Sequence, residues 1–354
     1  MNSALPGHLR LRTTAFYGVS LPVLLVSAVT AVAIGSTPLD WHTILHVCMA
    51  KALPAAWAEI PAASPADQVI VWLIRIPRVI VAMLVGAGLA TAGAILQGLF
   101  RNPLAEPSLT GVGPGAALGA VLAFITGWSL RSPSVLPLLA MTGAVMALAL
   151  VYAMATRGGV TPMSTLLLAG IAIGSLLTAV SSLLLSLNIV NWQIAQEIVF
   201  WMMGGLESRT WTHVWLSAPF IALGLAVSLL KARELDLFLQ GEETAASLGV
   251  NVEAAKRLLI LTAAILTGAS VAVAGMIGFV GLIVPHAVRL VLGPAHRVVL
   301  PASAVGGAVF LVLCDLLART VHPPTEIRLG VVTALCGGPF FLALLLRRYR
   351  EISL

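Results

Sequence analysis

Long stretches without a charged side chain dominate this sequence. No Asp, Glu, Lys or Arg occurs in the blocks 13–39, 79–100, 107–130, 132–156, 158–196, 210–230, 258–288, 298–314 and 329–346. Most blocks match the roughly 20 apolar residues that one helical crossing of a bilayer needs. With 59% hydrophobic and 10% charged residues and a mean hydropathy of +1.02, the chain lies outside the range of soluble domains. The sequence therefore predicts a membrane protein.

Two blocks need separate interpretation. Block 158–196 has room for a crossing and an outer loop, and block 258–288 is interrupted by small residues at 275–278, which divides it into two crossings. The sequence then predicts ten transmembrane helices, at 14–36, 70–98, 108–127, 134–156, 162–188, 211–231, 256–274, 278–293, 298–318 and 327–347. The ten-residue alternation of a membrane barrel is missing, so the predicted fold is an all-α polytopic membrane protein forming a single domain, 1–354.

The Lys and Arg residues predict the orientation. An even number of crossings places both termini on one side, and cytoplasmic loops carry the excess of Lys and Arg. With cytoplasmic termini, thirteen of the 20 Lys and Arg residues are cytoplasmic and seven are outside. The net charge of +6 is thus a topology signal, and no basic stripe suggests a nucleic-acid partner.

Small residues suggest how the helices pack. Residues 82, 86, 90, 94 and 98 are all Ala or Gly, and 111, 115 and 119 are all Gly. Such faces let helices approach closely, and we expect both to be buried within one subunit. The segments 89–93 and 271–275 are also similar, which suggests an inverted repeat of helices two to five and seven to ten.

One sizeable polar segment interrupts the apolar pattern, a predicted cytoplasmic loop at about 232–256. Within it, residues 242–249 begin with Glu242 and Glu243 and end with Gly249. Acidic residues favour a helix start and Gly favours its end, so the sequence predicts a short helix here. From the residues alone, a solvated loop and a docking element explain the segment equally well.

Motifs for catalysis are missing from the sequence. It contains no G-x-x-x-x-G-K-[ST] motif, and none of its three lysines follows a Gly, so it cannot cradle a nucleotide phosphate by that route. It has no H-E-x-x-H and no G-x-S-x-G either. The three cysteines are far apart and predict neither disulfide nor thiolate metal site. We therefore expect a chain that is not an enzyme and holds no cofactor.

A few titratable residues within or beside the apolar blocks are candidates for function. Asp315 precedes Arg319 by four residues, which predicts a local ion pair rather than a proton relay. His42 and His46 are also four apart, with Cys48 nearby, on an outer segment that could form a short helix. This spacing suits a metal or haem, although an interfacial loop explains the pair more simply.

Longer motifs resemble a known family. The run 75–107, which includes Arg75-Ile76-Pro77-Arg78 and Gln97-Gly98-Leu99-Phe100-Arg101-Asn102-Pro103-Leu104, resembles the permease family of type II ABC importers for ferric siderophores, haem and cobalamin. Matches continue in family order at 201–205, 278–286, 300–302 and 330–334. The resemblance thus covers nearly all of the chain from about residue 70.

The resemblance implies ten helices in a bacterial inner-membrane subunit surrounded by lipid. It implies three partners: a second copy of the chain, two ATPase subunits that bind ATP and Mg, and a periplasmic substrate-binding protein. It also implies site residues, all numbered in this sequence: Glu242, Glu243, Ala246, Leu248 and Gly249 for coupling to the ATPase; Arg75, Arg78 and Arg319 for docking the binding protein; and Asn102, Leu104, Thr161 and Met163 for a cytoplasmic gate.

The expected function is ATP-driven import of an iron chelate, haem or a ferric siderophore, through a homodimeric pathway. Most of the resembling family handles iron chelates, and His42 and His46 slightly favour haem. The alternatives are a cobalamin importer of the same family and, from another class, a proton-coupled secondary transporter dependent on Asp315. The scarcity of ionisable residues within the apolar blocks disfavours the transporter of that second class.

Overall fold

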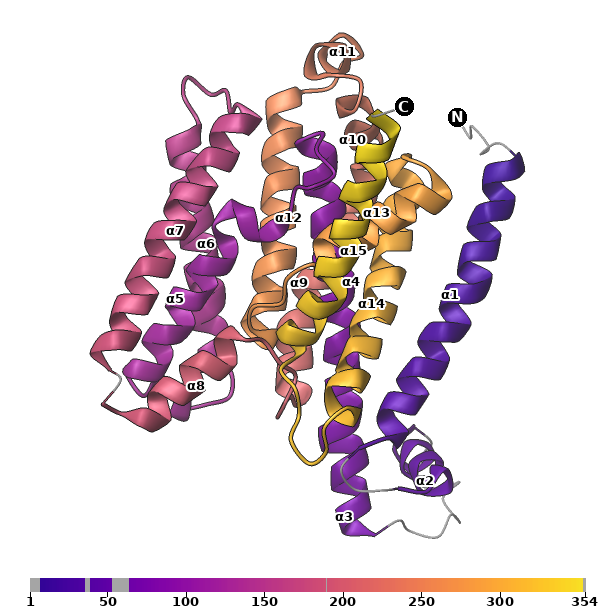
Figure 1. Ribbon diagram of the computed structural model, residues 1–354, viewed down its shortest axis with the longest axis vertical. Helices are drawn as coiled ribbons and strands as arrows, with labels where there is room; N and C mark the ends of the chain where they lie inside the picture. Colours follow the sequence, from indigo (N-terminus) through magenta and orange to yellow (C-terminus); the bar gives the residue numbers. More distant parts are fainter. Residues whose placement is uncertain (1–6, 36–38, 53–63, 189, 353–354) are drawn as a thin grey trace.

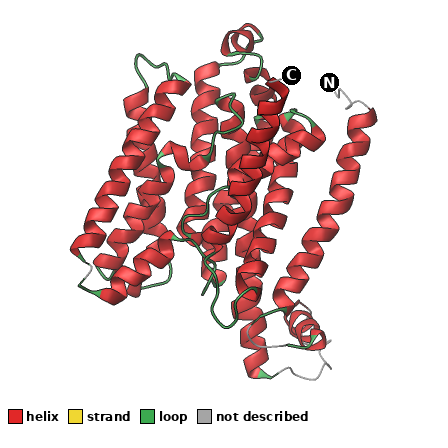
Figure 2. Cartoon of the chain, in the orientation of Figure 1, coloured by secondary structure: helices red, strands yellow, loops and turns green. Residues whose placement is uncertain are grey.

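The fold is helical throughout the part of the chain that the structure describes. The structure, a computed structural model, describes residues 7–35, 39–52, 64–188 and 190–352. Helices joined by loops make up these residues (Figure 2), and a single isolated bridge pairs Arg157 with Val160. The predicted all-α class is confirmed.

The helices follow one another in short succession along the chain. Their bounds are α1 (Gly7–Ala33), α2 (Trp41–Ala52), α3 (Pro65–Gln68), the π-helix η2 (Val69–Arg75), α4 (Ile76–Leu99), the 3-10 helix η3 (Pro107–Thr110), α5 (Val112–Ile125), the 3-10 helix η4 (Trp128–Leu130), α6 (Val135–Ala155), α7 (Met163–Leu187), α8 (Trp192–Met202), α9 (Trp211–Leu230), α10 (Ala232–Phe238), α11 (Glu242–Ser247), α12 (Val252–Ala274), α13 (Val280–Leu292), α14 (His296–Thr320) and α15 (Leu329–Ile352).

Seven helical runs in the described residues are long and apolar enough to cross a membrane: α1, the continuous run from α3 to α4, α6, α7, α9, α12 and α14. The shorter apolar helices α5 and α13 and the apolar part of α15 occupy the other predicted positions. Each predicted range thus contains an apolar helix, although residue 36, the end of the first range, lies outside the described residues. Ten full crossings stay a prediction, because α5 and α13 are shorter than a typical span.

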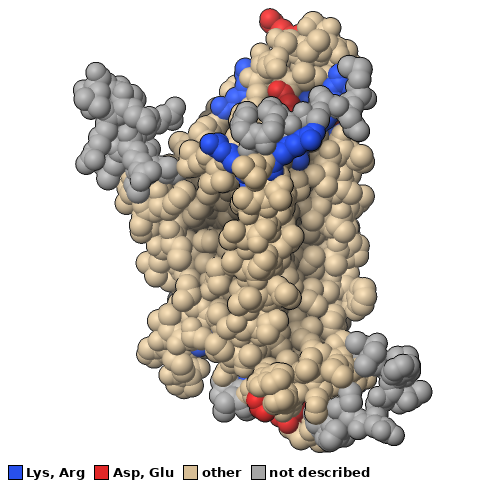
Figure 3. All heavy atoms as spheres, turned by 90° about the vertical axis from the view of Figure 1, so that its right-hand side faces the viewer, with Lys and Arg blue, Asp and Glu red and all other residues tan. Residues whose placement is uncertain are grey.

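The two ends of the molecule differ in what they carry. Helices α10 and α11 lie at one end, together with the beginning of α1 and the end of α15, whereas α2 and α3 lie at the other (Figure 1). On the face shown in Figure 3, charged side chains gather at these ends and the band between them is uncharged. This arrangement is that of a membrane-embedded bundle in which the beginning of α1 and the end of α15 lie on the side of α10 and α11 (Figure 1), and the predicted cytoplasmic location of the termini stays a prediction.

Helix α4 is the core of the bundle, since nearly every residue from Val79 to Leu99 is buried and α9, α12, α13 and α14 all contact it. A Cβ atom added at Gly86 would lie 2.1 Å from the carbonyl oxygen of Gly307 on α14. One added at Gly115 on α5 would lie 2.5 Å from the carbonyl oxygen of Gly143 on α6. Both small-residue faces therefore pack inside the subunit, as the sequence predicts.

This backbone contact predicts that Gly86→Ala destabilises the chain. The added methyl group has no space against Gly307, so the helices must separate, at a cost of about 1–3 kcal/mol for overpacking. Thermal unfolding in detergent measures the effect. Gly18→Ala on α1 is the matched control because no atom lies within 4 Å of the added methyl group, and equal melting temperatures for both variants would contradict the prediction.

The structure corrects the predicted helix pattern in two places. The stretch assigned to an outer loop after residue 188 contains α8. Asn191 caps the beginning of this helix, because its side chain accepts a hydrogen bond of 3.4 Å from the Ile194 N–H. Helix α12 begins at Val252, before the predicted residue 256, because the Asn251 side chain caps it through the Ala254 N–H at 3.1 Å. Side-chain caps, rather than hydropathy, set both boundaries.

Two interruptions in the helices meet near the centre of the bundle. The predicted break at 275–278 is confirmed, because α12 ends at Ala274 and α13 begins at Val280. A corresponding loop separates α4 from η3 and α5. A Cβ atom added at Gly93 on α4 would lie 1.8 Å from the carbonyl oxygen of Gly281 on α13. The interrupted segments thus lie in backbone contact, and the inverted repeat itself stays a prediction.

Candidate functional site

A cavity of about 540 Å³ adjoins the two interruptions. Its walls come from α4, η3, α5, α8, α12, α13, α15 and the loop between α12 and α13. The lining is mostly apolar and includes the flexible side chains of Met202, Met203 and Met276. Among the described lining residues, Glu106 alone is charged. Ligand sites commonly have this size and this combination of an apolar wall with few polar groups.

Glu106 fixes the wall of the cavity. Its carboxylate oxygen Oε1 accepts a hydrogen bond of 2.8 Å from the Phe279 N–H. Phe279 precedes α13 and has φ of 69°, in the left-handed region that non-glycine residues seldom adopt. Charge-assisted bonds of this kind hold such backbone in place. Glu106 therefore joins the loop after α4 to the beginning of α13.

The predicted gate residues lie on two loops. Asn102 and Leu104 are exposed in the loop after α4, where the Asn102 side chain accepts a hydrogen bond of 3.0 Å from the Leu104 N–H. Met163 begins α7, and Thr161, two residues before it, is fully buried. The gate role of these residues stays a prediction.

The predicted short helix at 242–249 is confirmed as α11, followed by Gly249 with φ of 83°. The side chains of Glu243, Ala246 and Leu248 are exposed, and Leu248 retains 56% of its accessible surface. Glu242 differs from them because it bonds inward.

Lys256, counted in the sequence only as a cytoplasmic charge, is the partner of Glu242. The Lys256 side chain is 2% exposed. Its ammonium group lies 3.0 Å from Glu242 Oε2 and 2.7 Å from Glu253 Oε1, and it donates to the Thr161 carbonyl oxygen at 2.9 Å. These bonds use all three donors of an ammonium group. One side chain therefore joins α11, α12 and the loop before α7.

The loop before α7 is bonded to α12 a second time. The Thr161 N–H donates to Glu253 Oε2 at 3.1 Å, and the Thr161 hydroxyl lies 3.2 Å from the Tyr152 hydroxyl. Thr161, a predicted gate residue, is thus held by the same cluster that anchors the predicted coupling helix. Sequence reasoning missed this cluster because its members are far apart in the chain.

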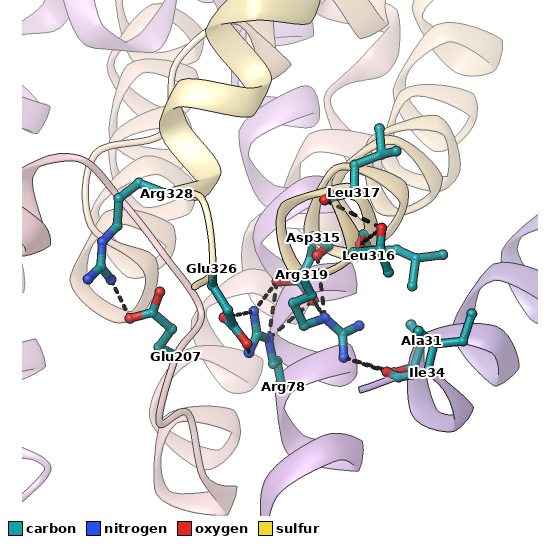
Figure 4. Close-up of polar contacts among 11 residues, drawn as sticks. Ala31, Ile34, Arg78, Glu207, Asp315, Leu316, Leu317, Arg319, Glu326 and Arg328 are labelled. Carbon is teal, nitrogen blue, oxygen red and sulfur yellow. Dashed lines mark hydrogen bonds and ion pairs between the residues drawn. The ribbon is translucent and has the colours of Figure 1, made fainter. Parts of the chain in front are cut away.

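The opposite end of the bundle contains a second buried cluster, centred on Asp315 (Figure 4). The predicted local pair exists, with Arg319 Nε 3.2 Å from Asp315 Oδ2. A stronger partner comes from α4: Arg78 donates to Asp315 from Nε at 3.1 Å and from a terminal nitrogen at 2.8 Å. Arg78 also bonds Glu326 at 2.8 Å. Asp315 and Arg78 are 2% and 11% exposed, so the pair is shielded from water.

Arg75 and Arg319 hold the end of α1. Arg75 donates to the carbonyl oxygens of Val32 and Ala33 at 2.9 and 2.7 Å. Arg319 donates to those of Ala31 and Ile34, both at 3.1 Å (Figure 4). A helix leaves its last carbonyl groups without internal partners, and cations there are favourable.

These bonds bear on the predicted docking role of the arginines. Arg75, Arg78 and Arg319 are buried and bonded within the chain. Docking a binding protein would require them to exchange these partners, so the role stays a prediction.

Further charges lie in the loops around this end. Arg328 forms an ion pair with Glu207 (Figure 4). Its guanidinium carbon also lies 4.0 Å from the centre of the Phe200 ring. In the loop between α8 and α9, burial lowers the pKa of Arg209 to about 10, against the opposing attraction of Glu207. Both arginines were counted in the sequence only as outer charges.

The outer histidines lie on α2. The His42 ring packs on the Trp41 ring, with centroids 3.6 Å apart, and Cys48 is a free thiol. Among the described residues, no group of three or more His, Cys, Asp or Glu side chains could hold a metal ion. His42 and His46 thus lack a third ligand within that part of the chain.

Comparison with known proteins gives consistent matches over most of the chain. The model of the FecCD transport family matches residues 23–347. A cobalamin import system permease protein, BtuC of Halobacterium salinarum, is 46% identical and aligns over 94% of this chain and 90% of its own length. The hemin transport system permease protein HmuU of Yersinia pestis is 38% identical and aligns over 97% of this chain and 99% of its own length. The Fe(3+) dicitrate transport system permease protein FecD of Escherichia coli is 40% identical and aligns over 77% of this chain and 84% of its own length.

A solved structure extends the likeness to the fold. It is described as an inward-facing conformation of an ABC transporter of metal-chelate type. The TM-score is 0.81 at 30% sequence identity, covering 94% of this chain and 99% of the other. The arrangement of helices is therefore shared over nearly the whole length of both chains.

Proposed function

The chain belongs to the FecCD transport family of ABC importer permeases, and we propose that two copies of it form the pathway through which ATP hydrolysis on separate subunits drives a metal chelate into the cell. The observation that carries this proposal is the cluster around Lys256. It joins the exposed helix α11 to α12 and to the loop before α7. A force that a partner protein applies to α11 would therefore reach the membrane helices. The sequence has no phosphate-binding loop, so in the proposed cycle a partner subunit binds and hydrolyses ATP.

In the proposed assembly, each part of the chain has one task. The outward residues Glu243, Ala246 and Leu248 contact the ATPase, which binds ATP and Mg. Glu242 anchors α11 through Lys256, and the loops that carry Asn102, Leu104, Thr161 and Met163 close the cytoplasmic end. A periplasmic binding protein delivers the cargo to the end that carries α2. Docking there by Arg78 and Arg319 would exchange their bonds to Asp315 and Glu326 for carboxylates of that partner, and docking by Arg75 would exchange its bonds to the α1 carbonyl groups.

Two classes of cargo have specific support. The 46% identity to a cobalamin permease favours cobalamin. The similarity to hemin and ferric dicitrate permeases, at 38% and 40% identity, favours the iron chelates expected from the sequence. The cavity offers methionine side chains and one carboxylate rather than a metal-ligating cluster, which suits recognition of a whole chelate. Chelate import is therefore the proposed function, with cobalamin the first cargo to test.

The test is uptake by the reconstituted complex. The chain, its ATPase and its binding protein are placed in liposomes, and uptake of cobalamin, haem and a ferric siderophore is measured side by side with and without ATP. We expect ATP-dependent uptake of one class. Uptake driven by a proton gradient in the absence of ATP would overturn the proposal in favour of a secondary transporter.

The exposed surface of α11 provides a sharper prediction. Leu248→Asp places a charge where an apolar contact with the ATPase is proposed, and we expect at least a tenfold loss of affinity, about 1.4 kcal/mol. Retention of purified ATPase on the immobilised chain measures it. Leu130→Asp is the control, since Leu130 is 84% exposed and precedes α6, whereas the loop bonded to Lys256 follows the other end of that helix. Equal ATPase binding by both variants would remove α11 from the interface.

A further inference from the structure

A second connection begins on α10, beside α11, at the partly exposed Asp236 and continues through the buried side chains of His296 and Gln97. The carboxylate oxygen Oδ1 of Asp236 accepts two hydrogen bonds from His296 at the start of α14, from the backbone N–H at 2.7 Å and from ring nitrogen Nδ1 at 2.9 Å. His296 is fully buried. A Cβ atom added at Gly98 on α4 would lie 2.6 Å from its Nε2 atom, so the ring packs directly on the α4 backbone.

The connection continues through α13 and α4. A terminal nitrogen of Arg289 lies 3.3 Å from His296 Nε2 and donates to the Ala94 carbonyl oxygen at 3.1 Å. The other terminal nitrogen bonds Gln97 Oε1. The amide nitrogen of Gln97 then donates to the carbonyl oxygens of Gly281 and Leu282, both at 3.2 Å. Gly281 lines the cavity that adjoins the two helix interruptions.

Donors and acceptors are consistent along this chain. Arg289 can only donate, so His296 accepts at Nε2, carries its proton at Nδ1 and donates that proton to Asp236. Gln97 accepts from Arg289 with its oxygen and donates to Gly281 with its nitrogen. Reversing the Gln97 amide would oppose donor to donor. Each side chain therefore has one orientation, and the chain is continuous from α10 to the cavity wall.

Burying the polar side chains of Gln97 and His296 costs free energy. Buried polar side chains destabilise a protein unless they are bonded, and networks that are fully bonded hold one arrangement. Residues 97 and 296 lie where α4, α13 and α14 otherwise pack through apolar and small residues. Leucine would fill such sites without the burial cost. The four polar side chains come from four helices and bond one to the next, so hydrogen bonds of fixed geometry link these helices.

We propose that the chain Asp236–His296–Arg289–Gln97 is a mechanical linkage that carries movement of the cytoplasmic segment α10–α11 to the cavity wall at Gly281, with Gln97 as the positioning residue. This inference rests on the proposed function. When the ATPase moves α10, Asp236 moves with it, and the bonds to His296, Arg289 and Gln97 displace the beginning of α13. Coupling between sites requires such a physical connection between parts that move.

The test reports movement of the wall directly. Cys48, Cys314 and Cys336 are replaced by Ser or Ala, and Ser108→Cys is added, because Ser108 is exposed and lines the cavity. The rate of maleimide labelling is measured on the assembled importer in liposomes, with and without ATP. In the otherwise unchanged chain we expect ATP to alter this rate about 5-fold or more, the usual lower range of coupling between sites.

Three variants then separate linkage from stability. Gln97→Leu removes both bonds of the side chain, and Gln97→Glu keeps the bond to Arg289 but loses the donor to Gly281. Thr91→Val on the same helix is the control, since the buried Thr91 hydroxyl has no hydrogen-bond partner in the described structure. We expect both Gln97 variants to lose the ATP response and most uptake per ATP hydrolysed, whereas Thr91→Val keeps both. Thermal unfolding in detergent identifies the variants that stay folded at the assay temperature, and only these are compared.

The outcomes are distinct. An ATP response preserved in Gln97→Leu overturns the linkage, as does a normal response in Gln97→Glu, because then only the bond to Arg289 matters. If Gln97→Leu does not fold, Asp236→Ala at the partly exposed end of the chain decides in the same assay. Failure of the unsubstituted complex to take up any chelate with ATP overturns the proposed function instead.

Discussion

Asp315→Asn is expected to destabilise the chain by about 3–5 kcal/mol, the usual cost of removing one partner from a buried ion pair. The Asp315 side chain is 2% exposed and lies between two arginines, at 2.8 Å from Arg78 and 3.2 Å from Arg319. Asparagine preserves the shape of the side chain but removes its negative charge. Both guanidinium groups then lack the charge of their shared partner while they stay shielded from water. Thermal unfolding in detergent and the yield of folded protein measure the effect.

Two controls interpret this result. Glu326→Gln removes the other carboxylate bonded to Arg78, but Glu326 is 30% exposed, so water can take its place and the loss should be smaller. Combining Asp315→Leu with Arg78→Met removes a charge of each sign and should cost less than the sum of the single changes. An Asp315→Asn chain that melts normally but no longer imports would contradict the structural role and favour the proton relay of a secondary transporter.

Lys256→Met is expected to separate ATP hydrolysis from transport. Methionine fills the same space but removes the three bonds that hold α11, α12 and Thr161 together. The loss of the buried pairs should cost about 3 kcal/mol, at the low end because Glu242 and Glu253 are partly exposed and can be hydrated. Uptake per ATP hydrolysed should fall at least tenfold in the assembled importer.

Lys231→Met is the matched control for this change. Lys231 lies at the same end and pairs with Glu234 at 2.7 Å, but both side chains are partly exposed, so the pair should contribute less than about 1 kcal/mol. Transport by this variant should be unchanged. If Lys256→Met also imports normally with its ATPase attached, the cluster around Lys256 does not transmit force and the proposed coupling route is wrong.

Hydropathy predicted where helices form far better than which polar residues meet. Each charge-free block contains an apolar helix because the bilayer requirement acts on about 20 consecutive residues and is visible locally. Helix α8 was missed because it has eleven residues and lies in a stretch too short for another crossing. The short helix α11 was found because acidic residues and glycine mark its ends within a few positions.

The candidate site was predicted unevenly for the same reason. The pair Asp315 and Arg319 is visible at a spacing of four, whereas Arg78 is 237 positions from Asp315 and no local pattern joins them. Lys256 was counted as a topology charge, although its side chain is buried and bonds Glu242 on α11 and Thr161, which is 95 positions away. The docking role of the arginines came from resemblance, and the structure shows that all three already have partners inside the chain.

The grip on the end of α1 has a consequence for how the protein is made. Arg75 follows α1 closely in the chain, so it can bond the Val32 and Ala33 carbonyl groups soon after both have left the ribosome. Arg319, on α14, can bind the neighbouring carbonyl groups of Ala31 and Ile34 only after α14 has been synthesised. Helix α1 therefore gains its full set of bonds only when α14 has packed against it, even though Arg75 can hold its end earlier.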